Sequence, residues 1–174
     1  VGGGVRKISD IQNLLHAGAD KVSINTTAVT NRNFVKEAAE KYGTSTIVIA
    51  VDAKNNSQKS WEVFTHGGRN ATGIDVVDYC NEVASLGAGE ILLTSMDKDG
   101  TKSGFDIELL KKITSSVNIP VIASGGVGTL EHFAEGILQG GVNSVLAASV
   151  FHFGQFKIQD VKRYLADKNI PVRI

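Results

Sequence analysis

The sequence predicts an α/β fold built on a parallel sheet. Short apolar stretches rich in β-branched residues alternate with amphipathic stretches of helical spacing, and the strand candidates are apolar at nearly every position. Such strands are typical of a parallel sheet buried on both faces. No linker or low-complexity segment divides the 174 residues, so we expect one domain over 1–174. An open doubly wound sheet and a closed barrel both fit these observations.

Composition and charge exclude several classes of protein. The chain is 42% hydrophobic and 21% charged, which suits an ordinary globular domain. Lys+Arg and Asp+Glu both number 18, so nothing favours nucleic acid or an anionic membrane as a partner. The longest apolar runs, such as Ile47–Val51, are far shorter than the roughly 20 residues that span a bilayer. The single cysteine, Cys80, and the lack of a visible leader predict a cytoplasmic protein.

The elements follow one another in strict alternation. Strands are predicted over five stretches and a stub at the first residue: Val1, Lys21–Asn25, Thr46–Asp52, Glu90–Ser95, Pro120–Ser124 and Ser144–Ala148. Helices are predicted over Ser9–His16, Asn31–Tyr42, Asp75–Leu86, Asp106–Ser116, Thr129–Gln139 and Ile158–Lys168, with Ser9, Asn31, Asp75, Asp106 and Thr129 as N-caps. An additional small hairpin is expected from Trp61–Thr65 and the following His66-Gly67-Gly68-Arg69.

An internal repeat favours the barrel. Gly3-Gly4-Val5 aligns with Gly125-Gly126-Val127, and 18–22 and Asn25-Thr26 then fall on 141–145 and Ala148-Ser149. The repeat distance of 122 residues holds about four strand–helix units of about 30 residues, so two repeats make the eight units of a TIM barrel. Because the chain holds only five complete strands and a stub, we expect an incomplete TIM (βα)8-barrel covering about units 3 to 8, with about 70 to 80 N-terminal residues missing.

Small and polar residues gather where the strands end, which is where barrels carry their sites. Small residues there let a phosphate approach backbone N–H groups at the positive ends of helices. One phosphate site is predicted at Gly125, Gly126, Ala148 and Ser149, and the repeat places a second at Gly4, Asn25 and Thr26 on the opposite side. Tight turns alone would also explain single glycines. Two such sites at equivalent positions of the repeat indicate a ligand phosphorylated at both ends.

Carboxylates at the strand ends supply candidate acid–base groups. Asp52 ends an apolar strand and is our candidate general acid or base between the phosphate sites, the alternative being a structural carboxylate paired with Lys54. Asp97 and Asp99, in the loop after the next strand, are candidates to orient ligand hydroxyls, and Gly100 offers another N–H. The four histidines lack metal-ligand spacing, so neither a metal nor another cofactor is expected.

Several motifs resemble the cyclase subunit of imidazole glycerol phosphate synthase. The similarity runs along most of the chain and is carried by 20–25, 50–54, Thr65–Arg69, 87–104, 122–127 and 146–153. It implies a lyase of histidine biosynthesis that joins ammonia to a bisphosphorylated ribulosyl-formimino-carboxamide nucleotide. The products are imidazole glycerol phosphate and aminoimidazole carboxamide ribonucleotide. Asp52 matches one of the family's two catalytic aspartates, and the other would precede residue 1.

The resemblance also implies roles for other residues. It assigns phosphate contacts to Gly4, Asn25 and Thr26 at one end, and to Asp99, Gly100, Gly126, Ala148 and Ser149 at the other. Asp20 and Lys21 match positions where a glutaminase subunit docks and ammonia enters. Two other readings stay open: a partial barrel that binds phosphate without catalysis, and the sister phosphoribosyl-formimino isomerase, against which Thr65–Arg69 and 147–153 argue. We also expect the open barrel to have little activity alone and to self-associate through its sheet edges.

Overall fold

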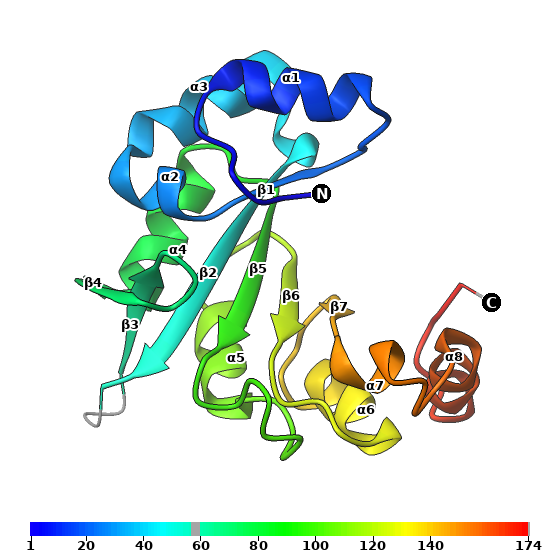
Figure 1. Ribbon diagram of the computed structural model, residues 1–174. Coiled ribbons are helices and arrows are strands. Elements are labelled where there is room, and N and C mark those ends of the chain that lie inside the picture. Colours follow the sequence, from blue (N-terminus) through cyan, green and yellow to red (C-terminus); the bar gives the residue numbers. More distant parts are fainter. Residues whose placement is uncertain (57–59, 174) are drawn as a thin grey trace.

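The computed structural model describes residues 1–56 and 60–173 and has the alternating α/β architecture expected from the sequence (Figure 1). The strands are β1 (Val22–Ile24), β2 (Ile47–Asn55), β3 (Trp61–Thr65), β4 (Asn70–Asp75), β5 (Glu90–Ser95), β6 (Val121–Ser124) and β7 (Ser144–Val145). The helices are α1 (Ile8–His16), α2 (Thr26–Thr30), α3 (Arg32–Tyr42), α4 (Val76–Ser85), α5 (Ile107–Thr114), α6 (Leu130–Leu138), α7 (Ser149–His152) and α8 (Ile158–Asp167), with a 3₁₀ turn η1 (Thr44–Thr46).

The order of the strands distinguishes the two architectures that the sequence left open. Strands β1, β2, β5, β6 and β7 are parallel and lie side by side in chain order. Gly2 adds one further parallel bridge beside Ser23, and the β3–β4 hairpin extends the carboxyl end of β2 in antiparallel pairing. A doubly wound sheet reverses its strand order at a switch point, which this sheet does not do. The arrangement is that of a partial TIM barrel.

The two faces of the sheet have different environments. In β2, Ile47, Ile49 and Val51 are buried in the same core as helix residues such as Val35 and Val83. On the other face, Ala50 and Asp52 are only half-buried. This face is the interior of the partial barrel, and the neighbours of Asp52 in register, Thr94 on β5 and then Ser124 on β6, extend a polar row across it.

Caps explain where several helices begin. The Asp75 carboxylate accepts hydrogen bonds from the N–H groups of Val77 and Asp78, and Asp106 accepts from Leu109, which confirms both predicted N-caps. Ser9 is not an N-cap, because α1 begins at Ile8 with Lys7 before it. There the Asp10 carboxylate accepts from the N–H groups of Arg6 and Lys7, so a residue inside the first turn replaces the predicted cap.

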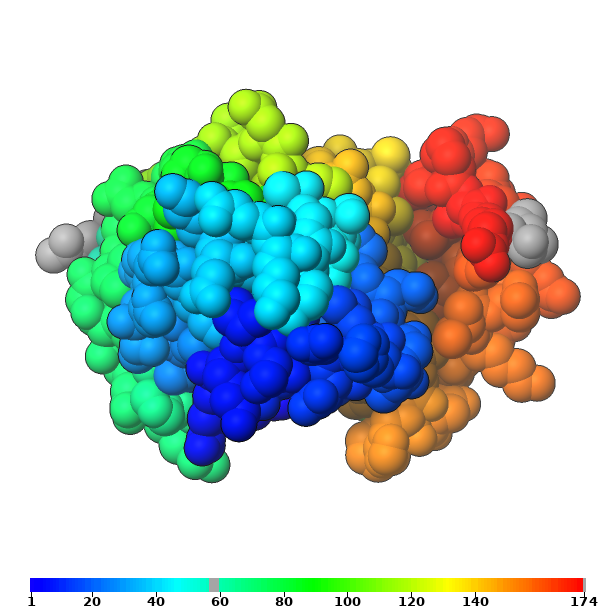
Figure 2. Space-filling view, turned by 90° about the horizontal axis from the view of Figure 1, so that it is seen from above, coloured from blue at the N-terminus to red at the C-terminus, as the bar shows by residue number. Residues whose placement is uncertain are grey.

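The space-filling view shows two lobes on one face of the molecule. The first 25 residues and the segment from α7 onward form separate lobes, with a furrow between them (Figure 2). Phe153 is 77% exposed in the second lobe, and Leu146, just before this lobe in the chain, is 40% exposed. None of the helices in 1–56 and 60–173 has the length and apolar character needed to cross a membrane.

Candidate functional site

The carboxyl ends of the parallel strands bring the predicted acid–base residue and both predicted phosphate sites to one edge of the sheet. Asp52 lies at this edge on β2, between β1 and β5. Its Oδ2 accepts a hydrogen bond of 3.0 Å from Nδ2 of Asn25, which follows β1. Asp52 is therefore a neighbour of the predicted Gly4, Asn25 and Thr26 site, and not a partner of Lys54, whose ammonium lies over the Phe64 ring.

The surroundings of Asp52 favour its protonated form. Burial raises the pKa of the Asp52 carboxyl above its usual range, and the negative charge of Asp99 raises it further, while the hydrogen bond from Asn25 opposes both effects. A carboxyl group with a raised pKa exchanges protons more readily near neutral pH. The arrangement thus suits Asp52 to act as a general acid or base.

The first predicted phosphate site lines an open cavity of about 970 Å³. Gly4, with φ of 68°, and Thr26 lie on its wall with Asn25, whose Oδ1 is buried and has no partner within the described part of the chain. The wall also includes Arg6 and His66, which sequence reasoning missed. We call this group, Gly4, Arg6, Asn25, Thr26 and His66, the first cradle.

His66 reaches the first cradle from the tip of the β3–β4 hairpin. Its backbone N–H donates a 3.1 Å hydrogen bond to Oγ1 of Thr26. Its Nδ1 lies 3.1 Å from Oγ1 of Thr65 and 3.3 Å from Nδ2 of Asn70. The hairpin was predicted from the sequence, but its contact with a residue 40 positions earlier depends on how β3 pairs with β2.

The second predicted site is a smaller pocket of about 130 Å³. This pocket is much smaller than the first cavity, and a small anionic group such as a phosphate suits it better than a whole nucleotide. All of the residues predicted for this site line it: Asp99, Gly100, Gly125, Gly126, Ala148 and Ser149. We call this pocket the second cradle.

Two glycines let the backbone of the second cradle close tightly. Gly125 and Gly126 have φ of 95° and 102°, which L-residues with side chains rarely adopt. A Cβ at Gly126 would lie 2.1 Å from the carbonyl oxygen of Gly104. Here the N–H of Gly104 donates a 2.8 Å hydrogen bond to the carbonyl of Gly126.

The repeat seen in the sequence is also visible in the backbone. Gly3 and Gly125 have φ of 104° and 95° at equivalent positions. A helix of one turn or little more follows each equivalent strand, α2 after Asn25 and α7 after Ala148. The residues before these helices, Asn25 and Ala148, have φ of −113° and −106°. The sequence did not predict either helix, although the alignment of Asn25-Thr26 with Ala148-Ser149 placed their starting points in register.

The loop between β5 and α5 is fastened at both ends. The carbonyl of Ser95 accepts from the N–H of Asp99, and the buried Ser95 hydroxyl lies 3.3 Å from Oδ2 of Asp106. The same carboxylate accepts a 3.1 Å hydrogen bond from the indole of Trp61. Asp97 accepts a 2.7 Å hydrogen bond from the N–H of Asn55 and does not line the second cradle. Of the two loop aspartates considered as ligand-orienting, Asp99 alone lines this cradle.

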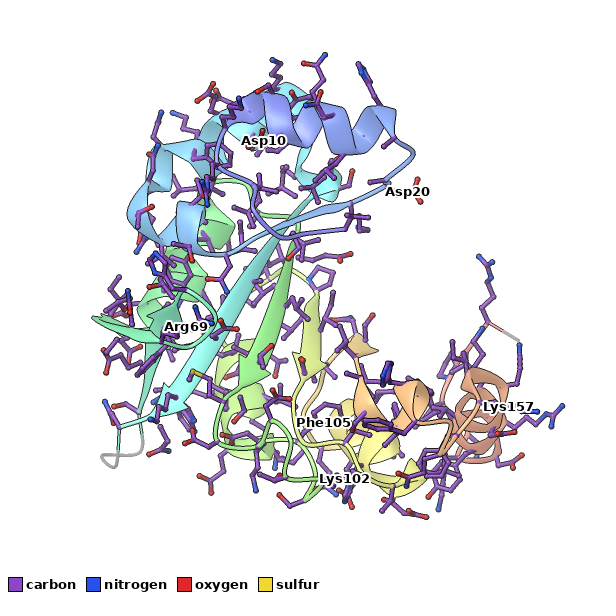
Figure 3. All side chains as sticks on the ribbon, viewed as in Figure 1. Asp10, Asp20, Arg69, Lys102, Phe105 and Lys157 are labelled. Atoms are coloured by element: carbon purple, nitrogen blue, oxygen red, sulfur yellow. The ribbon has the colours of Figure 1, made fainter. Side chains whose placement is uncertain are left out.

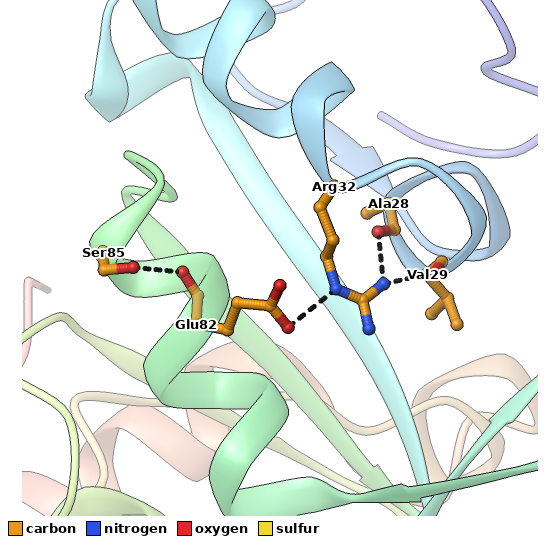
Figure 4. Close-up of polar contacts among 5 residues, drawn as sticks. All are labelled: Ala28, Val29, Arg32, Glu82 and Ser85. Carbon is orange, nitrogen blue, oxygen red and sulfur yellow. Dashed lines mark hydrogen bonds and ion pairs between the residues drawn. The ribbon is translucent and has the colours of Figure 1, made fainter.

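Arg32 holds α2, which begins with Thr26 of the first cradle. Its Nη1 donates to the carbonyls of Ala28 and Val29 at the end of α2, while Nε donates a 2.8 Å hydrogen bond to Oε2 of Glu82 on α4 (Figure 4). The guanidinium also lies over the ring of Tyr79 at 4.4 Å. Arg32 therefore links the helix that follows β1 to the layer of helices outside the sheet.

Lys21 and Asp20 lie at the opposite, amino end of the strands. The Lys21 ammonium forms an ion pair of 2.8 Å with Glu90 at the start of β5, and it donates to the carbonyl of Ser45 at 2.9 Å. Asp20 is exposed in the turn before β1 (Figure 3). Both residues are well separated along the strands from Asp52.

Among the described residues, neither the cysteine nor the possible metal ligands form a second site. Cys80 is buried, and burial raises the pKa of its thiol to about 12, so the thiol stays protonated and unreactive at neutral pH. Within residues 1–56 and 60–173, no group of three or more His, Cys, Asp or Glu side chains could hold a metal ion.

Comparison with protein families agrees with this geometry. A family model described as "Histidine biosynthesis protein" matches residues 1–157. The chain therefore belongs to the histidine biosynthesis family, whose members are enzymes. This match covers both cradles and Asp52, but it does not distinguish the cyclase from the sister isomerase.

Proposed function

We propose that this member of the histidine biosynthesis family acts in the cyclase subunit of imidazole glycerol phosphate synthase. Its substrate would be the bisphosphorylated ribulosyl-formimino-carboxamide nucleotide, which reacts with ammonia to give imidazole glycerol phosphate and aminoimidazole carboxamide ribonucleotide. The observation that carries the proposal is the position of Asp52 between two phosphate cradles. Asp52 contacts Asn25 of the first cradle, and the charge of Asp99 in the second cradle raises its pKa.

Each part of the edge has a distinct role in this proposal. The first cradle binds one phosphate of the substrate, with Gly4 and Thr26 at the backbone and Arg6 as a nearby cation. The second cradle binds the other phosphate through N–H groups of its glycine-rich turn. Asp52 then exchanges a proton with the part of the substrate between them. The free Oδ1 of Asn25 offers an acceptor to a substrate hydroxyl or N–H group.

The hairpin favours the cyclase over the isomerase. Thr65–Arg69 is among the motifs that resemble the cyclase more than the isomerase, and it lies at the tip of this hairpin. The His66 N–H bonds to Thr26, so this motif is part of the first cradle and not a remote insertion. The distinguishing segment is thus placed where it can contact substrate.

The amino end of the strands suits the supply of ammonia in the same proposal. A glutaminase subunit would dock near Asp20, and the Lys21–Glu90 ion pair would control entry to the interior face that leads to Asp52. Glu90 and Asp52 lie on this same face, because Glu90 pairs with Val48 and Val48 is four residues before Asp52.

Amide NMR of the ¹⁵N-labelled chain tests the proposal directly. We expect the bisphosphorylated nucleotide to shift the amide signals of Thr26 and Ser149 at the same ligand concentration, with one common titration midpoint, because one ligand spans both cradles. Inorganic phosphate, which fills each cradle separately, should shift the two signals with different midpoints. Separate midpoints with the nucleotide would contradict the proposal. Turnover assays with the cyclase and isomerase substrates then distinguish the two reactions when they use the chain extended by the first two strand–helix units, with Asp52→Asn as the control.

A second candidate is a partial barrel that binds phosphate without catalysis. The completeness of the second cradle favours it: its lining comes from the β5–α5 loop and from the segments that follow β6 and β7. In that case phosphate should raise the melting temperature at millimolar concentration, and Asp52→Asn should leave this rise unchanged. Any turnover that is lost in Asp52→Asn would exclude this candidate.

A further inference from the structure

We propose that Lys102 is the cation that binds the phosphate group in the second cradle. This inference rests on the proposed phosphate-binding function and adds a residue to it. Lys102 lines the 130 Å³ pocket from the β5–α5 loop, where Figure 3 labels it. From the sequence alone, no role was assigned to Lys102 itself.

The charges that line the second cradle show why a cation is needed. Asp99 and Lys102 are its charged lining residues, and the other lining side chains are uncharged. The Asp99 carboxylate repels a phosphate dianion that enters the pocket. A lysine ammonium that reaches this pocket would offset the repulsion, and lysine is well suited to binding phosphate as a point charge.

The backbone of Lys102 provides a second, independent observation. Its φ of 57° lies in the left-handed region, which glycine adopts without strain and lysine does not. The turn is held by its neighbours: the Oγ atoms of Thr101 and Ser103 lie 2.8 Å apart, and the Ser103 N–H donates to Thr101. A glycine at position 102 would therefore serve the turn better, so the lysine side chain has a use other than local folding.

Close packing fixes the place of this strained residue. A Cβ at Gly128 would lie 2.4 Å from the carbonyl oxygen of Lys102 and 2.7 Å from its Cβ. Lys102 is thus pressed against the turn that carries Gly125 and Gly126. Its side chain is exposed, and its ammonium forms no ion pair with any carboxylate of the described residues. The charge remains available for a ligand.

The test compares variants of Lys102 by phosphate titration. Inorganic phosphate is titrated into the ¹⁵N-labelled chain while the amide signals of Gly126, Ser149 and Thr26 are followed. We expect Lys102→Met to weaken binding at Gly126 and Ser149 about ten-fold, the size of one lost charge-assisted hydrogen bond. Binding at Thr26 should not change. Lys111→Met, on the exposed side of α5, removes the same charge elsewhere and is the matched control.

Two further variants separate charge from structure. Lys102→Arg should restore most of the affinity, because it keeps the positive charge. Lys102→Gly relieves the backbone strain, so it should keep or raise the melting temperature without phosphate while it weakens phosphate binding as Lys102→Met does. Equal affinity in wild type and Lys102→Met would overturn the role of Lys102 alone. If phosphate does not shift Gly126 and Ser149 in the wild type, the second cradle and this inference both fail.

Discussion

Gly126→Ala tests the geometry of the second cradle, and its effect can be worked out from the structure. The backbone at this position has φ of 102°, where a residue with a side chain is strained by about 1 to 3 kcal/mol. The new methyl group would also lie 2.1 Å from the Gly104 carbonyl oxygen. Moving the two segments apart disrupts the Gly104 to Gly126 hydrogen bond, worth about 1 kcal/mol. We therefore expect Gly126→Ala to lower the free energy of unfolding by about 2 to 4 kcal/mol.

Gly100→Ala is the matched control for this substitution. Gly100 also has a positive φ, 77°, and lines the same pocket, but a Cβ there meets nothing within 4 Å. The Gly100→Ala variant should therefore be destabilised only by backbone strain. For a chain of this length 1 kcal/mol lowers the melting temperature by about 2 to 4 °C, so thermal melts resolve the difference. Gly126→Ala should also abolish phosphate binding at Ser149. Equal melting temperatures in the two variants would refute the close approach of Gly126 to Gly104.

Three other predictions follow from the same structure. Asp52→Asn should remove activity and raise stability at neutral pH. Since the folded-state pKa of Asp52 is raised, its ionised form destabilises the fold above that pKa, and this effect disappears as the pH falls below the unfolded value of about 3.9. The gain in melting temperature must then be larger at pH 7.5 than at pH 4.5. Arg32→Ala should lower the free energy of unfolding in urea by about 1 to 3 kcal/mol, because carbonyls at the end of α2 lose a charged donor. Glu82→Ala should lower it by less than about 1 kcal/mol, because it removes only the exposed ion pair. The reverse order would show that the ion pair makes the main contribution. The 174-residue chain alone should self-associate through the outer side of β7 and the half-exposed interior face, and a monomer in light scattering at micromolar concentration would contradict this.

The sequence predicted the elements whose signals are local. Glu90–Ser95 was predicted with the bounds that the structure has, since the apolar run Ile91–Leu93 and the small polar residues after it are a local signal of a strand and its end. Asp75 and Asp106 were recognised as caps because a carboxylate before an apolar run is itself the physical cause of the helix start. The short helices α2 and α7 were missed, because a helix of four or five residues has no measurable periodicity.

Only some residues of the candidate site could likewise be predicted from the sequence. Backbone positions such as Gly126 and Ser149 were found because a repeat in the sequence reports equivalent turns. The side chains that approach from elsewhere were not found. His66 reaches Thr26 through the pairing of β3 with β2, and Trp61 meets Asp106 across 45 residues. Asp97 resembled a ligand on sequence grounds, but its bond to the Asn55 N–H also depends on a long-range pairing.

The two cradles share a backbone design but carry different side chains. Both place a glycine turn beside the start of a short helix, with φ of 104° and 95° at Gly3 and Gly125 and of −113° and −106° at Asn25 and Ala148. The first cradle adds Arg6 and His66, while the second adds Asp99 and Lys102. Backbone N–H groups alone would accept either end of a bisphosphorylated ligand in either cradle. The unequal charges and the unequal volumes, about 970 and 130 Å³, give the two orientations different energies. In the proposed function, side chains that the repeat does not share would therefore determine how an unsymmetrical ligand lies over Asp52.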